Sequence, residues 1–245
     1  MSQPVQLDAE KVIATIDRLE KRIADRFPES SLRTTCGQFL EVAKHSKQNI
    51  EWIASPNLPL RLFSAIIILV GVSGLIYSIT YVDLRIQNTT LANVVTLSEA
   101  IFNDLVLIGA AIFFLVSIES RVKRGRALKS LNELRVIAHV IDMLQLTKDP
   151  NHVMTNRLDT ANSPKRTLTK MELQRYLDYC SEATALIAKV AALYSQSLPD
   201  EVVVGAVNEI ETLSTGLSRK IWQKIMILNS DKSSIELVES VTPNP

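Results

Sequence analysis

The sequence predicts an all-α fold, in which a two-pass transmembrane helical hairpin is joined to a cytoplasmic helical bundle. Two long apolar segments, residues 62–82 and 100–118, are separated by a short polar stretch. The rest of the chain has apolar residues at helical rather than strand-like spacing. Only 7 glycines occur in 245 residues, which is typical of a helical protein. Outside the hairpin about 185 residues remain, enough for one compact domain.

The two apolar segments have the length of membrane-spanning helices. Residues 62–82 contain no charged residue, and residues 100–118 contain only Asp104. A helix needs about 20 mostly apolar residues to cross a bilayer, and a buried soluble helix seldom stays apolar on every face for so long. The first residues lack the basic region and apolar core of a cleavable signal, so we expect residues 62–82 to drive insertion.

Charges flanking the apolar segments predict the orientation. Five basic residues follow the second segment without an intervening acid: Arg121, Lys123, Arg124, Arg126 and Lys129. The connector, residues 83–99, holds only one base. The positive-inside rule then places both termini in the cytoplasm. We therefore expect a protein that crosses a cell membrane twice, the inner membrane where the cell has two. The same five residues could contact anionic lipid headgroups, a role compatible with setting the topology.

The chain outside the hairpin is expected to form five cytoplasmic helices, at residues 5–27, 31–54, 121–147, 168–196 and 199–229. Residues 1–60 form an N-terminal helical pair, residues 61–119 the hairpin, and residues 120–230 a bundle that contains a long loop at residues 148–167. Residues 231–245 are a tail. Because no proline lies between residues 97 and 147, we expect one helix there, roughly 75 Å long at 1.5 Å per residue.

Apolar seams identify the faces that these helices bury. In residues 31–54 the seam has the 4-3 spacing of bundle and coiled-coil packing, and residues 168–196 carry two adjacent seams, which predicts neighbours on two sides. The first seam is Leu32, Cys36, Phe39, Ala43, Ser46, Ile50 and Ile53. The main seam of the second helix is Leu173, Leu177, Cys180, Thr184, Ile187, Ala191 and Tyr194. Capping boxes are expected at Thr96 with Glu99 and at Thr169 with Glu172.

Two polar groups are candidate functional residues. Arg135, His139 and Asp142 share a helical face and could bind metal or relay a proton, although a solvated or inter-helix polar stripe explains them without function. Asn103 and Asp104 lie inside the second apolar segment and could line an ion pathway, although near the outer interface Asp104 can hydrate. With two cysteines and three histidines, we expect buried free thiols and no metal or other cofactor.

The sequence excludes some classes of function and leaves two open. It contains no Walker loop, no GxGxxG, no GxSxG and no kinase signature, so we expect no enzyme. The 27 basic residues balance 26 acidic ones, which gives no reason to expect nucleic-acid binding. We expect a membrane-anchored interaction, scaffold or signalling module that works as a homo-oligomer or with a protein partner. The alternative is a small oligomeric channel or transport subunit with Asn103 and Asp104 near the pathway.

Overall fold

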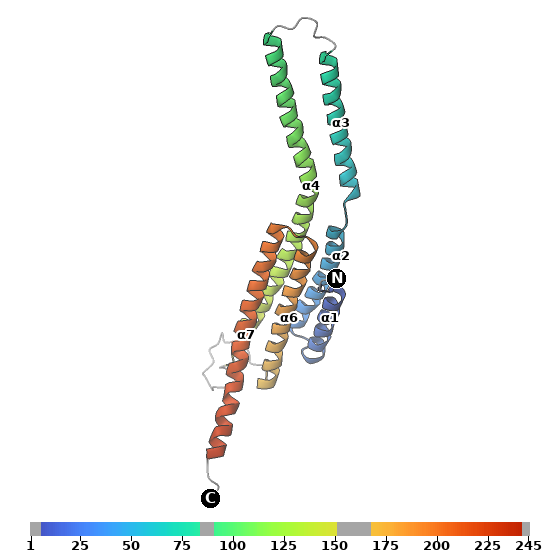
Figure 1. Ribbon diagram of the computed structural model, residues 1–245. Coiled ribbons are helices and arrows are strands. Elements are labelled where there is room, and N and C mark those ends of the chain that lie inside the picture. The colour runs from blue at the N-terminus through green and yellow to red at the C-terminus, as the bar shows by residue number, and fades with distance from the viewer. Residues whose placement is uncertain (1–5, 84–90, 151–167, 242–245) are drawn as a thin grey trace, which may run out of the picture. The chain divides into compact units, whose positions relative to one another are not determined.

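The computed structural model describes residues 6–83, 91–150 and 168–241, and every secondary-structure element in them is an α-helix (Figure 1). This confirms the all-α prediction for the described part of the chain. The helices are α1 (Ala9–Arg26), α2 (Ser31–Ala54), α3 (Leu58–Asp83), α4 (Leu91–Leu146), α6 (Lys170–Ser197) and α7 (Glu201–Val241). The expected long loop at residues 148–167 lies mostly outside the described residues.

The chain divides into two compact units. The bundle unit consists of Met1–Ala54 and Arg126–Pro245, and the apolar unit consists of Ser55–Gly125. The N-terminal helices α1 and α2 therefore belong to the same unit as α6, α7 and the last part of α4. Packing joins them, because α1 and α2 contact each other and both contact α6.

The core of the bundle unit is built from the apolar seams that the sequence predicts. Every member of the α2 seam is buried, as are both seams of α6. Helix α6 has neighbours on two sides because it packs along α7 and also contacts α1 and α2 (Figure 1). The largest fully buried side chains include Phe39, Ile141, Ile187 and Tyr194. Burial of such side chains supplies most of the stability of a helical bundle.

Local signals explain where α6 and α7 begin. Thr169 Oγ1 accepts a hydrogen bond from the backbone of Glu172, whose carboxylate accepts one from the backbone of Thr169, so the predicted capping box is confirmed. Asp200 Oδ1 accepts from the backbone N–H groups of Val202 and Val203 at the start of α7. The capping box at Thr96 is wrong, because α4 already begins at Leu91 and Thr96 lies inside it.

Two helices are longer than the sequence predicts. Helix α4 is continuous from Leu91 to Leu146, which confirms a single helix through this region. Helix α7 continues to Val241, whereas the sequence predicts that it ends near residue 229. No proline or glycine lies between Gly216 and Pro243, so no residue in that interval interrupts a helix.

The apolar unit contains α3 and the part of α4 before Arg126. Two of the described helices are long and apolar enough to cross a membrane. The start of α3 contacts α4 near Glu119, and only residues 84–90 join the far end of α3 to the start of α4. The two segments therefore run antiparallel, as Figure 1 shows.

Candidate functional site

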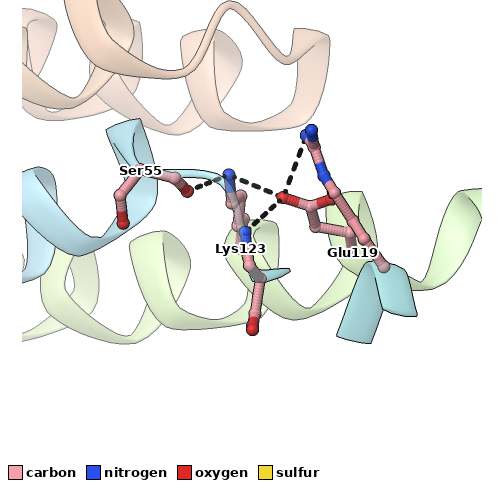
Figure 2. A network of polar contacts seen from close by, with 5 residues as sticks. Ser55, Glu119 and Lys123 are labelled. Atoms are coloured by element: carbon pink, nitrogen blue, oxygen red, sulfur yellow. Dashed lines mark hydrogen bonds and ion pairs between the residues drawn. The ribbon is translucent and has the colours of Figure 1, made fainter. Parts of the chain in front are cut away.

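The polar network at one end of the apolar unit is centred on Glu119 (Figure 2). Its carboxylate accepts hydrogen bonds from Arg61 Nε at 2.7 Å and from the backbone N–H of Asn57 at 3.1 Å. Lys123 Nζ lies 3.0 Å from Glu119 Oε1 and donates to the backbone oxygen of Ser55 at 2.8 Å. The network thus joins the first turn of α3, together with Ser55 and Asn57 before it, to one turn of α4.

The network keeps Glu119 ionised. The hydrogen bond from Arg61 lowers the pKa of the Glu119 carboxyl to about 2, with further lowering by the Asn57 N–H and Lys123, although burial opposes the shift. The same hydrogen bond raises the pKa of Arg61 above its ordinary value. Only 15% of the Glu119 side chain and 12% of the Lys123 side chain are exposed. Two cations around one carboxylate leave a local charge of +1.

Local sequence places these groups in reach of one another. Glu119 and Lys123 are four residues apart on α4, the spacing at which side chains on one helical face meet. Arg61 lies in the first turn of α3, where its backbone N–H bonds to Asn57 O. Pro59 sits in the same turn, where a missing backbone N–H costs nothing. The network therefore lies immediately outside both segments that the sequence predicts to be apolar, residues 62–82 and 100–118.

Exposed apolar side chains cover the apolar unit beyond this network. They occur on successive residues and not on one stripe, so the described parts of α3 after Arg61 and of α4 before Glu119 are apolar around their circumference. On α3 they are Leu62, Phe63, Ile66, Ile67, Leu69, Val70, Val72, Ile76 and Tyr77. On α4 they are Phe102, Leu105, Val106, Leu107, Phe113 and Phe114. Water is a poor solvent for such a surface, because soluble monomers rarely expose large contiguous apolar patches.

The structure assigns different surroundings to the five basic residues after the second apolar segment. Lys123 is held inside the Glu119 network, which argues against a role in contacting headgroups. Arg121 is exposed and lies over the Phe114 ring at 5.6 Å, whereas Arg126 lies over the Trp52 ring at 4.0 Å. Arg124 is half-buried and Lys129 is exposed. Arg121, Arg126 and Lys129 thus retain the exposure that a headgroup contact requires.

The structure does not gather Arg135, His139 and Asp142 into one cluster. Arg135 pairs with Glu209 of α7 at 2.5 Å, and Asp142 accepts a hydrogen bond from Gln145 at 2.7 Å. Arg135 and Asp142 are seven residues apart, roughly 10 Å along a helix, which is too far for a direct ion pair between them. His139 is exposed. The contacts match an inter-helix polar stripe, and within the described residues no group of three metal-ligating side chains occurs.

The possible ion pathway at Asn103 and Asp104 is not tested by these contacts. Asn103 is exposed on α4, and the side chain of Asp104 lies outside the described part of the structure. Cys36 and Cys180 are buried free thiols, as expected. Burial raises the pKa of the Cys36 thiol to about 12 and that of Cys180 as well, so both are held in the unreactive protonated form.

Sequence analysis did not identify Glu119 as a site residue. Its signal is present, however, in the printed sequence: it is the first acid after the second apolar segment, and a base follows four residues later. Arg61 stands directly before the first apolar segment. In a chain expected to fold as an antiparallel pair, those two positions must meet at the same end.

Comparison with known proteins finds no match: no family model, no curated protein and no solved structure is similar to this chain.

Proposed function

We propose that this chain is a two-pass membrane protein that displays the bundle unit in the cytoplasm as an interaction module. One observation carries the membrane assignment: the apolar side chains of α3 and of α4 before Glu119 are exposed on all sides instead of being packed in a core. Lipid is the solvent that suits such a surface, since every backbone polar group inside a helix is already hydrogen-bonded.

The Glu119 network supports the position of the membrane boundary. Charged groups are costly within the hydrocarbon and tolerated at the interface. Arg61, Glu119 and Lys123 lie next to the ends of the two apolar segments, and the guanidinium of Arg121, an exposed residue, lies over the Phe114 ring. A cation that lies along an aromatic ring while its charge reaches water is typical of the interfacial region. This network therefore marks the cytoplasmic edge of the proposed hairpin.

The orientation proposal follows from the positive-inside rule. The bases from Arg121 to Lys129 belong on the cytoplasmic side together with both termini, and residues 84–90 belong on the opposite side. In this topology the bundle unit, which is encoded before and after the hairpin, is assembled on one side of the membrane. We therefore propose that the protein is located in the cell membrane, which is the inner membrane in a cell that has two.

The interaction role rests on the surface of the bundle unit. Trp222 is 60% exposed on α7, and Met226 follows one turn later and is also exposed. Tryptophan is enriched among residues that dominate protein–protein contacts, and methionine is enriched at interfaces. These two side chains support a homo-oligomer or a protein partner, as expected for a scaffold or signalling module.

The topology can be tested in intact cells and in membranes. Alkaline extraction should leave the full chain in the membrane pellet, and tags at both termini should be labelled only after the membrane is permeabilised. A cysteine introduced at residue 87 should react with an impermeant maleimide from outside, whereas Cys36 and Cys180 should not. Labelling of either terminal tag in intact cells, or release of the chain by alkali, would refute the proposal.

The interaction role has a separate test. Light scattering of the detergent-solubilised chain should give a mass above that of one copy, and the substitution Trp222→Ala should reduce association. The exposed Met171, on α6, serves as the matched control through Met171→Ala. A strictly monomeric chain that also captures no partner after cross-linking in native membranes would exclude the interaction role while leaving the membrane assignment intact.

A further inference from the structure

Two basic residues of α4 lie side by side in the bundle unit without an acidic partner. Arg126 and Lys129 are three residues apart, the spacing at which side chains on one helical face meet, and both are exposed. Within the described residues neither side chain forms an ion pair or a hydrogen bond. Even Glu133, one turn after Lys129, is not within ion-pair distance of it. Neighbouring like charges repel on a helix, so this pair favours an external anion.

Trp52 of α2 holds the Arg126 guanidinium in place. The guanidinium carbon lies 4.0 Å from the centre of the Trp52 ring, and Trp52 itself packs against the hydrophobic core of the bundle unit. A guanidinium over an aromatic ring uses its flat face for that contact and keeps the N–H groups at its edge available. Those N–H groups match two oxygens of a phosphate, which arginine binds in a bidentate manner. Arg126 is therefore oriented in advance for a phosphate group.

The covalent chain places the two bases beside the proposed membrane boundary, which the network of Figure 2 marks. Arg126 follows Lys123 of that network by three residues in the uninterrupted helix α4. Trp52 precedes Ser55 of the same network by three residues. At 1.5 Å per residue, Arg126 and Lys129 lie at most roughly 5 and 9 Å further from the hydrocarbon than Lys123. The headgroup layer of one leaflet is about 5–7 Å deep, so the long side chains of both bases reach it.

We propose that Arg126 and Lys129 bind the phosphate of an anionic lipid headgroup, with Trp52 as the support that orients Arg126. The inference rests on the membrane assignment proposed above, because that assignment is what brings headgroups to this surface. One phosphate accepts hydrogen bonds from the Arg126 guanidinium and pairs with the Lys129 ammonium, and it relieves the repulsion between the two bases. The site thereby fixes the bundle unit to the headgroup layer.

The charge of the site selects among lipids. A zwitterionic headgroup such as phosphocholine carries its own cation beside the phosphate, which weakens its attraction to two further cations. A phosphomonoester headgroup has no such cation and exposes its oxygens, so phosphatidic acid suits the site best. Anionic lipids give the cytoplasmic leaflet its negative surface potential, and the positive-inside rule assigns these bases to that side. The expected ligand is therefore an anionic lipid whose phosphate is accessible.

Spin-labelled lipids in nanodiscs test this site with the full chain. Phosphatidylcholine nanodiscs contain a trace of spin-labelled phosphatidic acid, or of spin-labelled phosphatidylcholine as the reference. Electron paramagnetic resonance then measures the lipid that the protein immobilises. We expect the wild-type chain to prefer phosphatidic acid, and Arg126→Gln or Lys129→Gln to lower its relative association constant roughly fivefold. Lys220→Gln removes an exposed base of α7 and is the matched control, with no change expected.

Two further measurements separate this site from simple charge attraction and from a free-phosphate site. Arg126→Lys keeps the charge but loses the planar guanidinium, so it should also lower the preference for phosphatidic acid. Inorganic phosphate at constant ionic strength should not displace the labelled lipid. Wild-type preference in Arg126→Gln or Arg126→Lys, an equal loss in Lys220→Gln, or displacement by inorganic phosphate would overturn the proposal. If alkaline extraction still leaves the chain in the membrane pellet, such a result refutes the lipid site alone; release of the chain by alkali refutes the membrane assignment as well.

Discussion

The Glu119 network predicts a local loss of stability when its carboxylate is removed. The difference between the ordinary carboxyl pKa of 4.5 and about 2 corresponds to roughly 3 kcal/mol, at 1.36 kcal/mol per unit of pKa. Because 60% of the Arg61 side chain is exposed, solvent screening reduces that value, and we expect a loss of about 1–3 kcal/mol in Glu119→Ala. The loss should appear where α3 begins, since the carboxylate contacts Asn57 and Arg61.

Hydrogen exchange at the backbone amide of Asn57 measures this loss directly. That N–H donates to Glu119 Oε1, so it loses its acceptor in Glu119→Ala. A loss of about 1–3 kcal/mol corresponds to roughly 5- to 150-fold faster exchange in detergent micelles or nanodiscs. Glu119→Gln keeps a neutral acceptor oxygen and should give a smaller increase. Glu41→Ala, which removes an exposed carboxylate that pairs with Lys44, is the control and should leave the amide unchanged.

The rate of hydrogen exchange at the Asn57 amide should also depend on pH, and the pKa of Glu119 sets the direction of that dependence. The folded-state pKa of Glu119 is depressed, so its contribution to stability is fully present above pH 4.5 and is lost as the pH falls toward 2. The ratio of intrinsic-rate-corrected exchange in Glu119→Ala to that in the wild type should therefore shrink across this window. Equal protection of Asn57 in the two proteins at pH 7 would refute the network as the element that holds α3 against α4.

Three further predictions concern the bundle unit. Ile187→Ala removes a fully buried side chain from α6 and should lower the free energy of unfolding by about 2–5 kcal/mol in chemical denaturation, whereas exposed Val136→Ala should have little effect. Thr169→Ala removes the capping box of α6 and should cost about 0.5–2 kcal/mol in the same assay. Cys36 and Cys180 should resist maleimide at pH 8 until the chain is denatured, because burial keeps both thiols protonated; rapid labelling of the folded chain would contradict their burial.

The predicted seams and their burial agree because helical periodicity is a local property. Ala43, Ser46 and Ile50 lie on one face of α2 whatever packs against it, and all three are buried. Thr169 and Glu172 form their capping box from atoms only three residues apart, so it too could be read from the sequence. Thr96 and Glu99 have the same spacing but do not begin a helix, because α4 starts at Leu91 and includes them.

Partners of charged and polar side chains could not be read from local sequence in the same way. Arg135 pairs with Glu209, 74 residues away, and not with Asp142 on its own helix. Lys123 is one of the five basic residues that the sequence offers for headgroup contact, yet its ammonium group is bound by the backbone oxygen of Ser55 and by the carboxylate of Glu119. A neighbouring helix supplies the partner of Arg135, and Ser55, in the segment between α2 and α3, supplies the remote partner of Lys123, so both choices depend on how the chain packs.

The sequence by itself determined the all-helical class, the faces that the bundle helices bury and the two segments that are long and apolar enough to cross a membrane. These properties depend on the spacing and composition of residues within one helix. Tertiary structure alone decided that α1 and α2 join α6 and α7 in one core and that Glu119 holds Arg61, which lies 58 residues away in the chain. Those outcomes depend on distances between residues remote in the chain, which periodicity does not encode.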